Sequence, residues 1–397
     1  MKIAYFIASY LSSIGGGDVF THNIASELAQ RGIEATVITP TSRKLKKKVF
    51  DYPVIYINPL IAKLLFKFPA LGKRWLLYEM DRLQKRHNFS LWQVIGGYPL
   101  GTYGVDYLNK KNIPSVLRCM GEDIQKVPEI RYGYRLKPPV DRLIREKYPL
   151  FDKIAALTKS VSEELESIQI PRDKITIIPN GIKFERFKEP CDRLSVRDRL
   201  GVQAGELLLL TVGRYHSKKG SRYIPVILQR LLERGYKVRW LLVGIEVRRV
   251  FEGDLTPDVK ERIILRNVDI GLDEKNRLDI PAKELLEYYH AADLLVFPTL
   301  IETFGRVLIE AMASGLPLVS TNVAGVKDVV EHTKTGLLSE GGDIEAMVSN
   351  IERLSNDKAL YGKIKNNGLA KARDFDWSIV ADKYIDLYER AIERKKG

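Results

Sequence analysis

The sequence of 397 residues is poor in cysteine and has no long apolar run. Its two cysteines, Cys119 and Cys191, are far apart and lack metal-ligand spacing, which argues against a disulfide framework and favours a reducing compartment, with the cytoplasm as the expected location. The most apolar segment, residues 54–71, is interrupted by two lysines and two prolines, so no membrane-spanning helix is expected. Residues 1–11 lack a small-residue cleavage site and are expected to form a strand instead of a signal peptide.

Metal and hydrolase motifs are also missing. The histidines and cysteines show no zinc-ligand spacing, and neither a G-x-S-x-G elbow nor a G-x-x-x-x-G-K loop occurs. One D-x-D string, residues 374–376, lies before the last expected helix, where Asp376 is interpreted as the N-cap. Because such a short string is common, it does not indicate a metal site. We therefore expect no metal and no cofactor.

Composition and charge indicate a globular protein that is attracted to acidic partners. Apolar residues make up 45% of the chain and charged residues 29%. The length suits two domains of roughly 190 residues each. The net charge of +14 predicts attraction to a nucleoside diphosphate, to nucleic acid or to an anionic membrane surface. Since the basic residues accompany no motif that reads nucleic acid, nucleic acid is not expected as a partner.

Short apolar runs alternate with helical patterns along the chain. Residues 2–10 are apolar, and after three glycines Asp18 can cap a helix that ends at Gly32, before a second strand at 33–39. The later strands are expected at 93–95, 115–118, 153–157, 174–178, 207–212, 238–243, 262–265, 294–298 and 318–321, and a closing helix at 377–395. This pattern predicts an α/β fold with two Rossmann-like, doubly wound parallel sheets, divided into residues 1–185, residues 186–376 and a closing helix within 377–397.

The most specific motif is residues 298–321, where a strand ends at Pro298 and a helix begins near Gly305. Free amides at a helix N-terminus bind phosphate, and a glycine there permits close approach. Glu302, in the loop, would face a sugar beyond the diphosphate. Glu310, one to two turns into the helix, could accept hydrogen bonds from two ribose hydroxyls. Taken alone, the two glutamates favour the alternative of a capped helix that carries two solvated acids.

Two further segments could approach a phosphate. Residues 212–220 follow a buried strand and carry Arg214 and Lys219, which can neutralise a pyrophosphate as a planar fork and a point charge, with Lys218 as a solvated neighbour. A basic surface loop is the alternative. Three glycines, residues 15–17, follow the first strand without the G-x-G-x-x-G spacing of a dinucleotide site, and a plain tight turn is the alternative there.

Together, these segments resemble the retaining glycosyltransferases of family 4, group 1, which have the GT-B fold. The resemblance implies two domains that face each other across a cleft, the first for the acceptor and the second for the nucleotide-sugar, with the C-terminal helix crossing back to pack on the first. It also implies that Glu302 and Glu310 are the acids of the E-x7-E donor motif, and that Arg214 and Lys219 hold the diphosphate and stabilise the departing nucleotide. The donor-binding residues that it implies are Gly15, Gly16, Gly17, Arg214, Lys219, Glu302, Thr303, Phe304, Gly305, Arg306, Val307 and Glu310.

The sequence departs from the family in the first domain. Many members carry a His-Gly-x-Asp pattern near the reacting sugar, whereas residues 118–124 keep Gly121 and Asp123 but have Met120 in place of the histidine. Asp123, Glu122 or backbone groups could take over the role of the histidine, the sugar could be positioned otherwise, or activity could be lost. Asp123 is therefore included with Arg214, Lys219 and Glu302 among the candidate catalytic residues.

The expected reaction is metal-independent transfer, with retention, from a UDP-sugar or, next, a GDP-sugar. The nucleotide-sugar is then a co-substrate and not a cofactor, and the acceptor is expected to be lipid-linked, a glycolipid or a polysaccharide. One alternative is a catalytically inert nucleotide-sugar-binding module with the same fold, which Met120 supports. Another is a nucleotide-dependent oxidoreductase or epimerase, which leaves the paired acids and cations unexplained.

A possible membrane contact lies in the first domain. Residues 60–87 contain seven Lys or Arg against two acids, interleaved with leucine, phenylalanine and tryptophan. Such a basic amphipathic stretch suits peripheral binding to an anionic membrane surface and access to a lipid-linked acceptor. The alternative is an ordinary helix that packs its apolar face on the sheet.

Overall fold

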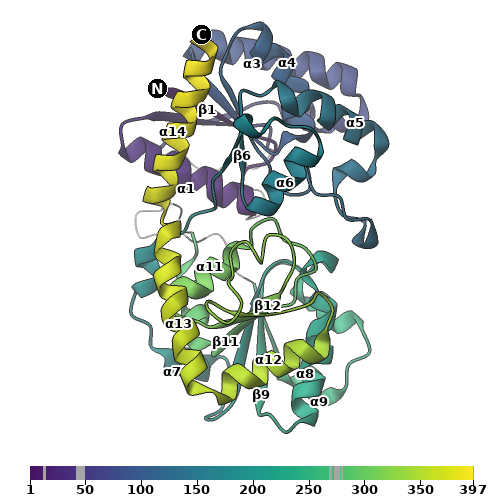
Figure 1. Cartoon of the computed structure of the whole chain (residues 1–397), viewed down its shortest axis with the longest axis vertical. Coiled ribbons are helices and arrows are strands. Elements are labelled where there is room, and N and C mark those ends of the chain that lie inside the picture. Colours follow the sequence, from purple (N-terminus) through teal and green to yellow (C-terminus); the bar gives the residue numbers. More distant parts are fainter. Residues whose placement is uncertain (12–14, 42–49, 268–270, 272–277, 279, 397) are drawn as a thin grey trace. The chain divides into compact units, whose positions relative to one another are not determined.

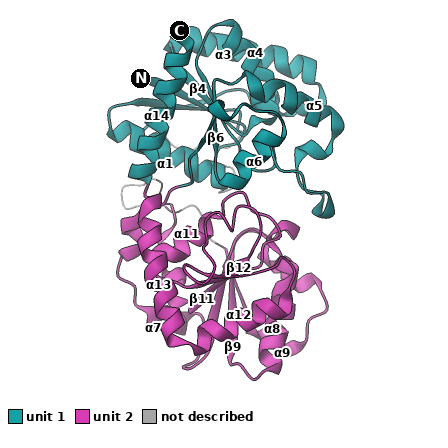
Figure 2. Ribbon diagram, in the orientation of Figure 1, with its two compact units in different colours: residues 1–180, 272–278, 377–397 teal, residues 181–271, 279–376 magenta. Residues whose placement is uncertain are grey.

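The computed structural model describes residues 1–11, 15–41, 50–267, 271, 278 and 280–396, and it forms two compact units (Figure 2). Of the described residues, unit 1 comprises 1–180, 278 and 377–396, and unit 2 comprises 181–271 and 280–376. The boundary between the units at Asn180 lies close to the boundary expected at residue 185. The last helix of the chain belongs to the unit that contains the first strand.

Unit 1 is built on a parallel sheet of seven strands in the order β3-β2-β1-β4-β5-β6-β7. Figure 1 shows β1 and β6 of this sheet with helices on both sides. The strands are β1 (Lys2–Ile7), β2 (Glu34–Thr39), β3 (Val54–Tyr56), β4 (Leu91–Ile95), β5 (Ser115–Arg118), β6 (Lys153–Ala156) and β7 (Ile175–Ile177). The central strands are buried along nearly their whole length, as expected for a parallel sheet that is covered on both faces.

Among the described residues, seven helices pack around this sheet. They are α1 (Gly16–Gln30), α2 (Leu60–Lys67), α3 (Pro69–His87), α4 (Thr102–Lys110), α5 (Pro138–Lys147), α6 (Lys159–Ser167) and α14 (Trp377–Lys396), with shorter helical turns at Gly97–Gly101, Pro128–Ile130, Tyr134–Leu136, Tyr148–Leu150 and Arg172–Lys174. Alternate residues of β1 point to opposite faces of the sheet. Phe6 packs into a core that includes residues of α2, α3 and α4, whereas Tyr5 bonds Tyr388 of α14 through their hydroxyl groups at 2.6 Å.

Unit 2 contains a parallel sheet of six strands in the order β10-β9-β8-β11-β12-β13. The strands are β8 (Leu207–Val212), β9 (Val238–Val243), β10 (Ile263–Arg266), β11 (Leu294–Phe297), β12 (Leu318–Thr321) and β13 (Leu337–Ser339). The helices are α7 (Arg193–Arg199), α8 (Ile224–Glu233), α9 (Pro257–Arg262), α10 (Lys283–Ala291), α11 (Arg306–Ala313), α12 (Ile344–Asn356) and α13 (Lys358–Ala372). Shorter turns lie at Phe184–Lys188, Ser217–Lys219, Ser221–Tyr223, Val247–Glu252 and Arg373–Phe375.

The predicted α/β fold with two parallel, Rossmann-like sheets is confirmed, with two additions. The edge strands β3 and β13 were not predicted. Each has only three residues, as β7 has, but β7 was predicted from the longer run 174–178, which ends in the turn residues Pro-Asn-Gly at 179–181. No helix in the described part of the chain is both long and apolar enough to cross a membrane.

The start of α1 differs from the expectation that Asp18 caps it from outside. The helix already begins at Gly16, so Asp18 lies inside its first turn. The Asp18 carboxylate accepts hydrogen bonds from the backbone amides of Gly15 at 2.9 Å and Leu11 at 2.7 Å. The acid therefore reaches back toward the end of β1 from the third position of the helix, where it bonds the amide of the N-cap residue as the acid of a capping box does.

Candidate functional site

The candidate residues of unit 2 follow two neighbouring strands, β8 and β11. The carboxyl ends of parallel strands meet at one edge of a sheet, and this edge is the usual ligand side of an open α/β fold. The loops after the two strands are bonded to each other. The Leu300 amide and the Thr299 hydroxyl both donate to the backbone carbonyl of Lys218, at 2.7 and 2.9 Å.

Gly220 holds the first loop against the end of β11. Its φ is +64°, and a Cβ at this position would lie 1.8 Å from the carbonyl oxygen of Pro298. A larger residue would force the two loops apart. The neighbouring Lys219 consequently lies over the strand end, with Nζ 4.7 Å from the centre of the Phe297 ring.

Lys219 forms an ion pair with Glu302, the first acid of the predicted donor motif. Glu302 is only 8% exposed, and its Oε1 also accepts the amide of Thr303 at 3.1 Å. Burial would raise the pKa of Glu302, but the charges of Lys219 and Lys218 outweigh it and hold the pKa below the ordinary value. Glu302 is therefore a carboxylate at neutral pH.

Arg214 lies on the same loop and is exposed. Within the residues that the structure describes, it forms no ion pair with a carboxylate. Between the two cations lies His216, whose Nδ1 accepts the backbone amide of Lys218 at 3.2 Å. Burial, followed by the charges of Lys218, Arg214 and Lys219, lowers the pKa of His216, so the ring is neutral at pH 7 and can keep this hydrogen bond.

The loop after β11 leads into α11 through Gly305, which has a φ of +80° and is the N-cap residue. Thr303 and Phe304 are buried, while Arg306 and Val307 are partly exposed at the start of the helix. The first amides of α11 have no partner inside the helix itself, as in any α-helix. These amides suit this end of the helix to an anion, and Glu302 lies close to them in the chain.

Glu310, the second acid, is 1% exposed inside α11. Its Oε1 lies 3.2 Å from Nε of Arg306, and its Oε2 accepts a hydrogen bond of 2.7 Å from the hydroxyl of Tyr289. Burial raises the pKa of Tyr289 well above its ordinary value, with the Glu310 charge as the next cause, so the phenol remains a donor. Tyr289 comes from α10 and was not identified as a site residue from the sequence, because an aromatic residue in a helix is usually interpreted as part of the hydrophobic core.

A third loop packs against the backbone of Glu302. Gly325 has a φ of +80°, and a Cβ there would lie 2.3 Å from the carbonyl oxygen of Glu302. The backbone of the donor loop is thus packed directly against the segment that follows β12. Glycine is required at this position because the two backbones touch.

The glycine run of unit 1 lies beside Met120. A Cβ on Gly17 would be 2.7 Å from the methyl carbon of Met120, so the methionine covers the first turn of α1. The thioether sulfur accepts a hydrogen bond of 2.9 Å from the guanidinium of Arg118. Arg118 is fully buried, lies 3.8 Å from the ring centre of Phe20 and donates to Asn180 at 2.6 Å. Met120 therefore contacts both the start of α1 and the end of β5.

Asp123 is 3% exposed and its carboxylate is occupied by donors of the chain itself. It accepts the amides of Gly97 and Met120 at 2.7 Å and of Gly121 at 3.0 Å, together with the Tyr148 hydroxyl at 3.2 Å. Burial raises the pKa of Asp123, although the amides of Gly97 and Met120 act in the opposite direction. These contacts favour a positioning role for Asp123, which fixes two loops at the carboxyl edge of the sheet.

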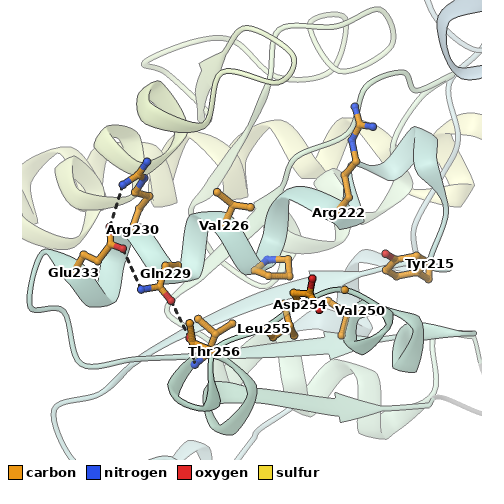
Figure 3. Close-up of a pocket in the computed structure, with 13 residues that line it drawn as sticks. Tyr215, Arg222, Val226, Gln229, Arg230, Glu233, Val250, Asp254, Leu255 and Thr256 are labelled. Atoms are coloured by element: carbon orange, nitrogen blue, oxygen red, sulfur yellow. Dashed lines mark hydrogen bonds and ion pairs between the residues drawn. The ribbon is translucent and has the colours of Figure 1, made fainter.

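The structure thus pairs Lys219 with Glu302 and Arg306 with Glu310 within unit 2, and it brings Met120 into contact with Gly17 and Asp123 within unit 1. A pocket of about 460 Å³ lies elsewhere on unit 2, between α8 and residues 247–259 (Figure 3). The polar side chains that line it bond largely to one another. Gln229 forms hydrogen bonds with both Glu233 and Thr256, and Glu233 also pairs with Arg230. None of the predicted site residues lines this pocket.

Comparison with known proteins places this geometry in context. Residues 192–371 match the family "Glycosyl transferases group 1", and residues 14–186 match "Glycosyltransferase Family 4". The D-inositol 3-phosphate glycosyltransferase of Thermobispora bispora is 26% identical over 96% of this chain and 91% of its own length. The capsular polysaccharide biosynthesis glycosyltransferase CapM of Staphylococcus aureus is 27% identical over 64% of this chain and 66% of its own length.

Solved structures share the fold. The sucrose-phosphate synthase from Thermosynechococcus elongatus has a TM-score of 0.79 at 19% identity, with 99% of this chain and 100% of that chain covered. HepE of Anabaena, solved in complex with UDP, has a TM-score of 0.75 at 19% identity, with 97% and 99% covered. Two glycosyltransferase families match successive parts of the chain, and the chain has the fold of these solved proteins. It therefore belongs to the GT-B glycosyltransferases of group 1, family 4.

Proposed function

We propose that this glycosyltransferase transfers a sugar from a nucleotide-sugar to an acceptor with retention of anomeric configuration and without a metal ion. The observation that carries the proposal is the ion pair of Lys219 and Glu302, which lies at the start of α11 on the ligand edge of the unit 2 sheet. Cations and helix amides suit the diphosphate of a donor, whereas buried carboxylates suit the hydroxyl groups of its sugar and ribose.

In the proposed reaction, the bond between the anomeric carbon and the phosphate oxygen breaks while the acceptor oxygen approaches the same face of the sugar. Negative charge then accumulates on the diphosphate. Arg214 and Lys219, with the first amides of α11, stabilise this charge without rearranging, which is the usual source of electrostatic catalysis. The proton of the acceptor hydroxyl passes to the departing phosphate oxygen, and the new bond joins the acceptor oxygen to the anomeric carbon.

Glu302 and Glu310 have different roles in this proposal. Glu302 accepts hydrogen bonds from sugar hydroxyls, since it follows the strand end and pairs with the cation that would hold the diphosphate. Glu310 binds the ribose from inside α11, held by Arg306 and Tyr289. Asp123 acts through the loops that it fixes in unit 1.

We propose a UDP-sugar as donor, with a GDP-sugar as the next candidate. The HepE structures, which share this fold, were solved with UDP and with UDP-glucose. The proposed acceptor is a lipid-linked sugar, a glycolipid or a polysaccharide. Relatives and structural neighbours act in capsular polysaccharide biosynthesis and in lipopolysaccharide biosynthesis, as their names state.

The surface of α2 and α3 supports a lipid-linked acceptor. Leu65 and Leu76 are fully buried in the core of unit 1, as an ordinary packed helix requires. The same two helices nevertheless leave large apolar side chains and cations exposed. We name these the α2–α3 patch, which comprises Lys63, Phe66, Lys67, Phe68, Leu71, Arg74 and Tyr78. Exposed aromatic residues beside lysine and arginine suit an anionic membrane surface, which we propose as a peripheral binding partner.

The proposed function is tested by nucleotide release from a panel of UDP-, GDP- and ADP-sugars, with a chelator present and a lipid extract as acceptor. Release from one donor, with the product in the same anomeric configuration as the donor, is the expected result. An inverted product would overturn retention, and dependence on added Mg²⁺ or Mn²⁺ would overturn metal independence. Donor binding without turnover, across acceptor extracts of polysaccharide as well as lipid, would favour the inert binding module instead.

A further inference from the structure

The ion pair between Lys219 and Glu302 joins two groups that the proposed function assigns to different parts of the donor. Lys219 is assigned to the diphosphate, and Glu302 to the sugar. In the structure the two side chains satisfy each other. An ammonium group has three donors, but the charge of Glu302 offsets the charge of Lys219, so a diphosphate competes with Glu302 for the electrostatic attraction of this group.

The backbones of both residues are held in place by contacts with neighbouring loops. Lys219 is held on a loop that Gly220 presses against Pro298, and its ammonium lies beside the Phe297 ring. The backbone of Glu302 is packed against Gly325. Since both loops are also bonded through the carbonyl of Lys218, the two backbones are held at a fixed separation, and only the flexible side chain of Lys219 can change the distance between the charges substantially.

The cost of separating the pair falls mainly on Glu302. Its side chain is 10% exposed, against 20% for Lys219. Without Lys219, Glu302 would keep the hydrogen bond from the Thr303 amide but lose its charged partner, and a buried carboxylate that loses its cation is destabilised unless other donors replace the cation. Whether a ligand supplies such donors therefore decides how well that ligand competes for Lys219.

We propose that Glu302 makes the site select the intact nucleotide-sugar over the free nucleoside diphosphate, by competing for Lys219. The diphosphate of the intact donor binds Lys219, and the hydroxyl groups of its sugar donate hydrogen bonds to Glu302 in place of the lysine. The nucleoside diphosphate that remains after transfer also binds Lys219, but it has no sugar hydroxyl groups that could donate to Glu302. Glu302 thus lowers the affinity for the product and favours its release. This inference rests on the proposed donor and on the assignment of Lys219 to its diphosphate.

The test compares wild type with Glu302→Gln, which keeps the size of the side chain but removes its charge. Dissociation constants for UDP, GDP and ADP, and for the corresponding nucleotide-sugars, are measured by calorimetry. The variant is expected to bind the preferred nucleoside diphosphate about threefold to tenfold more tightly than wild type, because Lys219 is freed. Its affinity for the intact donor should not rise in parallel, so discrimination between donor and product falls.

Two further variants separate this effect from a general change in the site. Glu352→Gln is the matched control, since Glu352 is likewise a partly buried partner in an ion pair of unit 2, with Arg234 at 2.6 Å. It should leave all dissociation constants unchanged. In a Lys219→Met background, Glu302→Gln should no longer tighten binding of the nucleoside diphosphate, because the group for which the two compete is gone.

Each outcome is decisive. Unchanged or weaker binding of the nucleoside diphosphate by folded Glu302→Gln would overturn the inference, while leaving the proposed function intact if wild type binds the donor. If none of the three nucleoside diphosphates or their sugars binds wild type, the proposed function itself is overturned. Glu302→Asp offers a second variant if the amide fails to fold, and its shorter side chain should give a smaller gain in product affinity.

Discussion

The hydroxyl of Tyr289 donates a hydrogen bond of 2.7 Å to Oε2 of Glu310, and both residues are almost fully buried. Glu310 lies in α11 and Tyr289 in α10, so the bond joins two helices that flank β11. On the other side of the carboxylate, Arg306 contacts Oε1. A carboxylate held from both sides in this way has a fixed orientation, which is what recognition of two adjacent ribose hydroxyls requires.

Tyr289→Phe is expected to raise the KM for the donor about fivefold to tenfold with little change in kcat, because a buried carboxylate then lacks one donor. The measurement is steady-state kinetics with the preferred nucleotide-sugar. Tyr288→Phe is the matched control, since the neighbouring hydroxyl bonds Glu284 instead. Equal effects of the two substitutions would show that Tyr289 does not position Glu310.

Arg214→Ala is expected to lower kcat about a hundredfold or more, because the exposed guanidinium is assigned to the charge that develops on the departing diphosphate. The free energy of unfolding should change by less than about 0.5 kcal/mol, since the side chain is exposed. Arg214→Lys should recover only part of the rate, as a lysine lacks the planar fork.

The rate and the unfolding free energy of the Arg214 variants are compared with those of Arg222→Ala, which removes another cation that follows the same loop and contacts Tyr223. This control should retain nearly full activity. A comparable loss of rate in both variants would point to the general positive potential of unit 2 instead of a specific contact.

The ionisation of Glu302 should appear in the stability of the protein. Its pKa in the folded chain lies below the ordinary glutamate value of 4.5. The stabilisation from its ionised form is therefore complete above pH 4.5 and is lost as the pH falls through the lower folded pKa. Chemical unfolding of wild type and Glu302→Gln at pH 7 and at steps below pH 4.5 should show the advantage of wild type shrinking toward acid. An advantage that grows toward acid would contradict this sign.

Binding to anionic vesicles should depend on the α2–α3 patch. Phe68 and Leu71 are 63% and 57% exposed, so the double substitution Phe68→Glu with Leu71→Glu should abolish flotation on phosphatidylglycerol vesicles at low salt without unfolding unit 1. Lys63→Glu with Lys67→Glu should act in the same direction and remove the salt dependence.

The matched control for the vesicle assay is Leu194→Glu, because Leu194 is a 78% exposed leucine of unit 2. This variant should float as wild type does. Absence of flotation by wild type at low salt would remove the membrane surface from the proposed partners.

The sequence by itself determined the two-sheet fold and the identity of the candidate site residues. Buried strands such as β1 and β8 are visible because their apolar runs span most of the strand, and such periodicity is a local property of the chain. The two glutamates, the two cations and the helix N-terminus became candidates because they resemble the donor motifs of the family, and each motif lies within one loop or one loop and the helix that follows it. The edge strands β3 and β13 were not predicted, whereas β7, which is equally short, was predicted because a turn signal follows it.

Only the tertiary structure decided which of these side chains contact one another. Lys219 and Glu302 are 83 positions apart and meet because β8 and β11 are neighbours in the sheet. Packing between separate elements makes Tyr289 a hydrogen-bond partner of Glu310. It also places backbone amides where they donate to the carboxylate of Asp123. Local patterns follow from the geometry of a single helix or strand, whereas the partners of a buried charge are set by long-range contacts that leave no periodic trace in the sequence.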